Sequence, residues 1–75
     1  MSKKKLFEDI KQNPARIYRT PSDVLRDRRF GDAERLEILR AWQGLAQGAP
    51  DLVEIEAVIL EAEGRLYATS GHAAE

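Results

Sequence analysis

Apolar residues recur three or four positions apart along most of the chain, the spacing that places them on one face of a helix. The first such group is Leu6, Phe7 and Ile10. Ser2 can cap a short helix here, and we expect it to end near Asn13–Pro14, because a proline disfavours helical geometry at the residue before it. Residues 14–19 show no clear period, so Ile17 and Tyr18 are expected to hold an extended or single-turn connector against the core.

The segment Thr20–Asp23 has the features of a second helix start. A threonine stands at the cap, a proline occupies the first turn, and an aspartate is placed to return a capping-box hydrogen bond. This predicts a short helix that ends at about Arg28 or Arg29. Beyond it, Gly31 or Asp32 is expected to cap the next helix.

The third helix is predicted over residues 33–47, with one core-facing stripe. At 100° per residue, its apolar side chains fall within an arc of roughly 120°. These residues are Ile38, Leu39, Trp42, Leu45 and Ala46. The only tryptophan therefore belongs to the predicted core.

After a turn at residues 48–51, the strongest helical pattern of the chain runs from Leu52 to about Ala68. One stripe of this helix is formed by Leu52, Ile55, Val58, Ile59, Ala62 and Leu66. A second stripe, on a separate face, is formed by Val53, Ala57, Leu60, Gly64 and Tyr67. Charged residues separate the two: Glu56 and Glu63 on one side, and Glu54, Glu61 and Arg65 on the other.

Two arrangements can account for the second stripe. It can face another molecule, with Ala57 and Gly64 allowing close approach of a helix and Tyr67 as the aromatic anchor. Alternatively, the last helix lies centrally among the other three, and both stripes are buried within one chain. The pattern alone leaves both open.

Composition adds a reason to expect a partner. A chain of 75 residues buries only about 60% of the surface that its unfolded form exposes, and the absence of cysteine removes disulfides and thiolate metal sites as staples. No apolar run approaches the length of a membrane span, and the composition fits a cytoplasmic protein.

Charge is divided along the chain: residues 1–40 hold 11 basic and 7 acidic residues (+4), and residues 41–75 hold one basic and six acidic residues (−5). The basic part of one molecule could meet the acidic part of another, or an acidic partner protein.

The sequence offers little for catalysis, and we predict no enzyme activity, no metal and no cofactor. The only histidine, His72, lies in the C-terminal tail, which leaves no Ser/His or Cys/His pair to assemble. The glutamates of the last helix fall on two opposed sides, as expected of a solvated acidic surface. The five glycines are too dispersed for a phosphate-binding loop.

The alternative function is nucleic-acid binding by a degenerate helix-turn-helix, formed by the second and third predicted helices. Its candidate basic patch is Arg26, Arg28, Arg29 and Arg35. Against it, the N-terminal turns of the second of these helices carry Asp32, Glu34 and Glu37, which phosphates would repel, and the sequence pI is about 5.8. We expect the arginines to meet Asp23, Asp27 and Asp32, or water. Nucleic acid is thus the weaker candidate partner.

The middle of the chain resembles small proteobacterial proteins that share a pattern of the form "P..VL.D...E...IL..W", preceded by an aromatic residue. The matching residues are Tyr18, Pro21, Val24, Leu25, Asp27, Phe30, Glu34, Ile38, Leu39 and Trp42. The resemblance covers about a third of the chain and departs from Gly44 onward. Because that family has no assigned activity, it implies an all-helical domain and no mechanism.

Together these patterns predict an all-α protein, a small bundle of four helices, two short and two longer, that could form a homodimer. Residues 1–68 are assigned to one helical domain and residues 69–75 to a disordered C-terminal tail. The expected function is that of a non-enzymatic protein–protein interaction domain. It would bind a second copy of itself, or another protein, through the second stripe of its last helix.

Overall fold

Five helices follow one another along the chain in the computed structural model, which describes residues 3–74, with side chains described up to residue 68. They are α1 (Lys3–Gln12), α2 (Pro14–Ile17), α3 (Pro21–Leu25), α4 (Asp32–Leu45) and α5 (Leu52–Ala74). No strand occurs within residues 3–74, and the all-α class is confirmed. The structure has one helix more than the four predicted. This additional helix is α2, a single turn inside the connector. The predicted cap at Ser2 lies outside the described residues.

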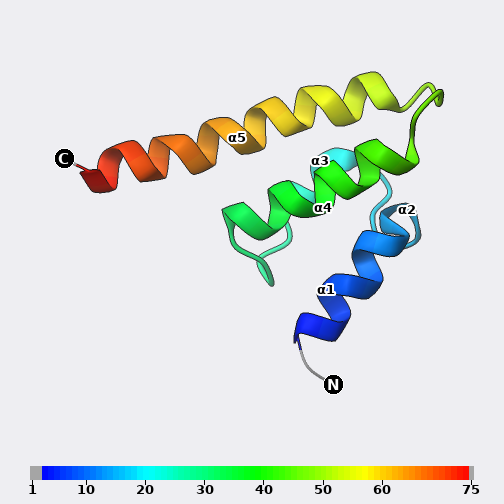
Figure 1. The fold of residues 1–75 in the computed structure, drawn as a ribbon, viewed down its shortest axis with the longest axis horizontal. Coiled ribbons are helices and arrows are strands. Elements are labelled where there is room, and N and C mark those ends of the chain that lie inside the picture. Colours follow the sequence, from blue (N-terminus) through cyan, green and yellow to red (C-terminus); the bar gives the residue numbers. More distant parts are fainter. Residues whose placement is uncertain (1–2, 75) are drawn as a thin grey trace.

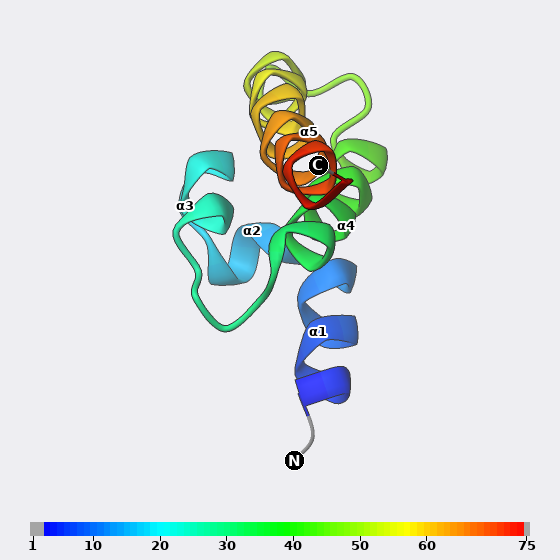
Figure 2. The ribbon, with the colours of Figure 1, turned by 90° about the vertical axis from the view of Figure 1, so that its left-hand side faces the viewer.

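The central element is α4, which contacts each of the other four helices. Figure 2 shows α1 and α5 on opposite sides of α4, with α3 beside α5. Along its length α5 lies over α4 and α3, and its C-terminal end extends beyond them (Figure 1). The arrangement in which the last helix is central is therefore wrong.

Buried apolar residues of α1, α3, α4, α5 and the connections between helices form the core around α4, and the buried Pro14 belongs to α2. The predicted core residues of α4 are buried except Leu45, which is 61% exposed, because it lies in the last turn at the edge of the stripe. Leu36 falls outside that stripe but is buried, since a central helix also needs apolar contacts towards α5. In α5 the first stripe is confirmed: Ile55, Val58, Ile59 and Ala62 are buried, while Leu52 and Leu66 are partly buried.

Capping explains the bounds of the short helices. The Asp23 carboxylate accepts a hydrogen bond from the Thr20 N–H at 3.2 Å, which confirms the predicted start of α3. The helix ends at Leu25 rather than at Arg28 or Arg29, because the Asp27 carboxylate accepts the backbone N–H of Arg29 at 3.0 Å and draws the chain into a turn.

Glycines occupy the connections on either side of α4. Gly31 is the cap of α4, and its N–H donates to Glu34 at 2.9 Å. Gly48 has a φ of 83° in the turn between α4 and α5, a conformation that favours glycine. Tyr18 is buried as predicted, but Ile17 is 47% exposed, so Tyr18 and the fully buried Pro14 hold the connector to the core.

The helical backbone of α5 continues to Ala74, beyond the predicted end near Ala68, and no proline interrupts it. The assignment of residues 69–75 to a separate tail stays a prediction, and Glu75 lies outside the described residues. Within residues 3–74, no helix has the length and apolar character that crossing a bilayer requires.

Candidate functional site: the outer stripe of α5

The second apolar stripe of α5 is exposed along its whole length. We call it the outer stripe, and it consists of Val53, Ala57, Leu60, Gly64 and Tyr67. Val53 is 76% exposed, Leu60 70% and Tyr67 61%. The alternative that both stripes are buried within one chain is therefore wrong.

The exposure follows from the position of α5 at the edge of the bundle. Its first stripe faces α3 and α4, so the face on the far side of the helix has no neighbour in the described part of the chain. A Cβ atom at Gly64 would meet nothing within 4 Å, so packing within one chain does not require a glycine there. Packing within the monomer therefore does not explain why small residues occupy the outer stripe.

One border of the outer stripe faces α4. Arg40 of α4 donates to Glu63 at 2.7 Å, and Gln43 donates to Glu56 at 3.4 Å. These contacts reach from the surface of α4 to α5 above the buried stripe. They help to fix the rotation of α5 about its axis, and with it the direction in which the outer stripe faces.

The other border faces α3. Arg65 donates to the Glu61 carboxylate at 3.1 Å and to the backbone carbonyl of Leu25, the last residue of α3, at 3.4 Å. A cation at the end of a helix satisfies carbonyl groups that have no partner inside it. Arg65 therefore ties α5 to α3 on the side opposite the contacts with α4.

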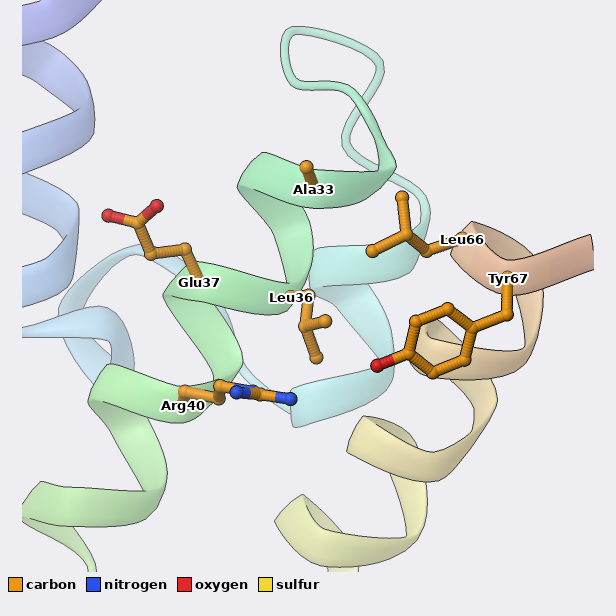
Figure 3. Close-up of a pocket in the computed structure, with 6 residues that line it drawn as sticks. All are labelled: Ala33, Leu36, Glu37, Arg40, Leu66 and Tyr67. Atoms are coloured by element: carbon orange, nitrogen blue, oxygen red, sulfur yellow. The ribbon is translucent and has the colours of Figure 1, made fainter. Parts of the chain in front are cut away.

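A shallow hollow of about 330 Å³ lies beside the C-terminal end of the outer stripe. It is lined by Ala33, Leu36, Glu37, Arg40, Leu66 and Tyr67. Figure 3 shows the Tyr67 ring reaching from α5 towards Leu36 of α4. Tyr67 therefore belongs to both the outer stripe and the rim of the hollow. The hydrophobic pattern did not reveal this hollow, because it depends on the packing of α4 against α5.

The candidate basic patch is largely neutralised within the chain. Ion pairs join Arg26 to Asp23 at 3.5 Å, Arg29 to Asp27 at 2.7 Å and Arg35 to Asp32 at 3.2 Å. These are the aspartates predicted as partners, so that expectation is confirmed for three of the four arginines. Arg28 is exposed.

The helix that would enter a DNA groove is paired with α1 near its N-terminal end. It would be α4, whose first turns carry Glu34 and Glu37. Lys3 of α1 pairs with Glu34 at 3.1 Å, and Lys11 of α1 pairs with Glu37. Lysines of α1 thus lie beside the acidic side chains at the N-terminal end of α4.

Asp27 organises the loop between α3 and α4 through Arg29, a predicted partner, and Tyr18, which was not predicted. Its carboxylate accepts hydrogen bonds from the Arg29 guanidinium at 2.7 Å and the Tyr18 hydroxyl at 2.7 Å. These bonds hold the pKa of the Asp27 carboxyl well below its usual range, against the opposing effect of burial. Burial and the neighbouring carboxylate raise the pKa of the Tyr18 phenol. The Tyr18 ring in turn stacks on Trp42 with centroids 6.5 Å apart.

Within the described residues, no group of three His, Cys, Asp or Glu side chains is arranged to hold a metal ion. The backbone of His72 belongs to α5, but its side chain lies outside the described part.

Comparisons with protein-family models, with curated proteins and with solved structures gave no match to this chain. The resemblance to the proteobacterial proteins therefore stays a prediction.

Proposed function

We propose that this protein is a non-enzymatic helical interaction protein that binds through the outer stripe of α5, and that a second copy of the chain is one of its partners. The observation that carries the proposal is the exposure of Val53, Leu60 and Tyr67 at helical spacing on one face. Contiguous apolar patches on small proteins mark interaction sites more often than scattered apolar residues do. The expected cytoplasmic location stays a prediction.

The geometry of the outer stripe suits a helix as the bound element. Spacings of 4, 3, 4 and 3 residues place the stripe along the helix axis, as in a two-helix seam. Large residues alternate with Ala57 and Gly64, so a partner helix can place its own large side chains over the small ones. Tyr67 adds an aromatic anchor at one end.

Self-association is tested by sedimentation equilibrium of the purified full-length chain over a wide concentration range, in low and in high salt. We expect a dimer that persists in high salt, because apolar contacts are not screened. Leu60→Glu should abolish association, since it places a charge in the middle of the stripe. At a protein concentration low enough for the wild type to be monomeric, its circular dichroism spectrum and unfolding midpoint should stay close to those of the wild type, because Leu60 is 70% exposed in the monomer.

Leu45→Glu is the matched control. It makes the same chemical change at an exposed leucine, 61% accessible, on α4 rather than on the outer stripe. It should leave the dimer intact. A wild-type chain that stays monomeric at every concentration would contradict self-association, and an equal loss in both variants would place the contact elsewhere.

A further inference from the structure

Both borders of the outer stripe carry more acidic than basic residues. Glu56 and Glu63 lie on the α4 side, and Glu54 and Glu61 lie beside Arg65 on the α3 side. Arg40 offsets Glu63 and Arg65 offsets Glu61 through the ion pairs already described. Within the described part of the chain, Glu54 and Glu56 form no ion pair with a basic side chain, although Glu56 accepts a hydrogen bond from the neutral Gln43. Two of the four border carboxylates are therefore uncompensated.

This charge pattern opposes the pairing of two α5 helices. Positions that flank an apolar seam face one another across a helix pair and determine partner choice. A parallel pair of outer stripes places the side that holds Glu54 and Glu61 against the side that holds Glu56 and Glu63. An antiparallel pair places Glu56 near Glu63 of the second copy, and only its contacts between Glu54 and Arg65 are attractive. Like charges placed together at an interface cost free energy and select against that partner.

The basic part of the same chain cannot cover the stripe within one molecule. The helix with the most lysines, α1, lies on the opposite side of α4 from α5, and the two make no contact in the described residues (Figure 2). Three of its lysines, Lys3, Lys4 and Lys5, lie in its first turn. A complementary charge must therefore come from another molecule.

We propose that the preferred occupant of the outer stripe is an amphipathic helix of another protein, with an apolar seam at the same spacing and lysine or arginine on both flanks. This inference rests on the proposed function, since it needs the stripe to be a docking surface. The apolar seam supplies affinity, and the glutamates select a basic helix over a second copy of the chain. A second copy of the chain then binds the same surface with lower affinity than the basic helix does.

The two kinds of complex respond to salt in opposite directions. Salt screens the repulsion between facing glutamates, so pairing of two outer stripes should strengthen from low to high salt. It also screens attraction between glutamates and basic flanks, so the complex with a basic helix should weaken. The direction of the salt effect thus identifies the occupant.

The experiment uses two synthetic, fluorescently labelled peptides about three heptads long, with leucine at both seam positions of each heptad. One carries lysine at all flanking positions and the other carries glutamate. The full-length protein is titrated into each, and binding is followed by fluorescence anisotropy. We expect the lysine peptide to bind at least about tenfold more tightly at low salt, with the difference shrinking as salt is added.

Two double variants test which acidic residues cause the preference for the lysine peptide. Glu54→Gln with Glu56→Gln removes the two uncompensated border charges, and should weaken binding of the lysine peptide about fivefold while improving that of the glutamate peptide. Glu8→Gln with Asp9→Asn removes two charges from α1 on the far side of α4, and should change neither affinity. Leu60→Gln, which adds no charge, should abolish binding of both peptides.

The outcomes separate this inference from the proposed function. Equal affinity for the two peptides overturns the basic-helix inference but leaves the stripe as a docking surface. If neither peptide binds while the wild-type chain dimerises through Leu60, the stripe serves self-association and the inference fails. Unchanged binding of the lysine peptide by Leu60→Gln would show that it docks elsewhere, and also overturns the inference. A monomeric chain that binds neither peptide removes both proposals.

Discussion

Asp27 shows how one polar residue can fix the position of a loop. Its side chain is only 9% exposed, and it joins Tyr18 of the connector to Arg29. Its own backbone carbonyl accepts a hydrogen bond from Arg35 of α4 at 3.0 Å. Because Tyr18 stacks on Trp42, this network connects the surface loop to the apolar core.

Replacing this carboxylate should cost measurable stability. Asp27→Asn keeps the shape of the side chain but removes the charge that Arg29 contacts, so we expect the free energy of unfolding to fall by about 2 kcal/mol. Urea unfolding followed by circular dichroism at neutral pH measures the change. Asp9→Asn, on the exposed surface of α1, is the control and should change stability by less than about 0.5 kcal/mol. A loss no larger than that of the control would contradict the role given to Asp27.

The same network predicts the direction of the pH dependence. The pKa of Asp27 is lower in the folded chain than in the unfolded chain, so its stabilising contribution is complete above about pH 4 and is lost as pH falls further. Between neutral pH and pH 3, the wild type should therefore lose more stability than Asp27→Asn does. Equal losses in the two proteins, measured by urea unfolding at both pH values, would contradict this linkage.

At the scale of the helix, α5 carries two apolar faces with different roles. One holds the core, and the other is left exposed by the position of α5 at the edge of the bundle. Gly64 lies on the exposed face, in the interior of the helix, where glycine is less favourable than alanine. The monomer gives no packing reason for it, since a Cβ there meets open space.

Gly64→Ala should therefore stabilise the monomer and weaken association. We expect the free energy of unfolding to rise by about 0.5–1 kcal/mol, measured by urea unfolding at low protein concentration. Sedimentation should show a weaker dimer, because the added methyl group separates the paired helices. Gly44→Ala in the last turn of α4, where a Cβ also meets nothing, is the control and should leave the dimer unchanged. Unchanged association in Gly64→Ala would show that close approach at this position is not needed.

The elements themselves could be predicted from the sequence because helical spacing and caps are local. The start of α3 at Thr20, the cap at Gly31 and both stripes of α5 all follow from residues a few positions apart. The early end of α3 was missed because the apolar pattern does not show that the Asp27 side chain accepts the backbone N–H of Arg29 and draws the chain into a turn. The exposure of the outer stripe could not be decided, since it depends on which helix is central.

At the scale of the whole molecule, the central position of α4 limits what the basic residues can do. A recognition helix must be exposed to enter a DNA groove, whereas α4 contacts every other helix and its first turns pair with lysines of α1. Three of the candidate arginines are already paired with aspartates. The candidate helix-turn-helix therefore lacks a free recognition helix in the described part of the chain.

We accordingly expect no detectable binding to random-sequence duplex DNA, even at low salt. Fluorescence anisotropy of a labelled duplex titrated with the full-length chain measures this, with a basic DNA-binding protein as the positive control. Salt-sensitive binding that is lost in Arg28→Gln would contradict the expectation and restore the nucleic-acid alternative.

The placement of α1 and α5 on opposite sides of α4 also gives the molecule an electric dipole. α1 holds four lysines and two acidic residues, whereas α5 holds four glutamates and one arginine, although the net charge of the chain is only −1. A nearly neutral protein with this distribution is turned by the field of a charged neighbour before contact. It would approach a positively charged body with α5 leading, so the outer stripe would arrive already facing the surface it is proposed to bind.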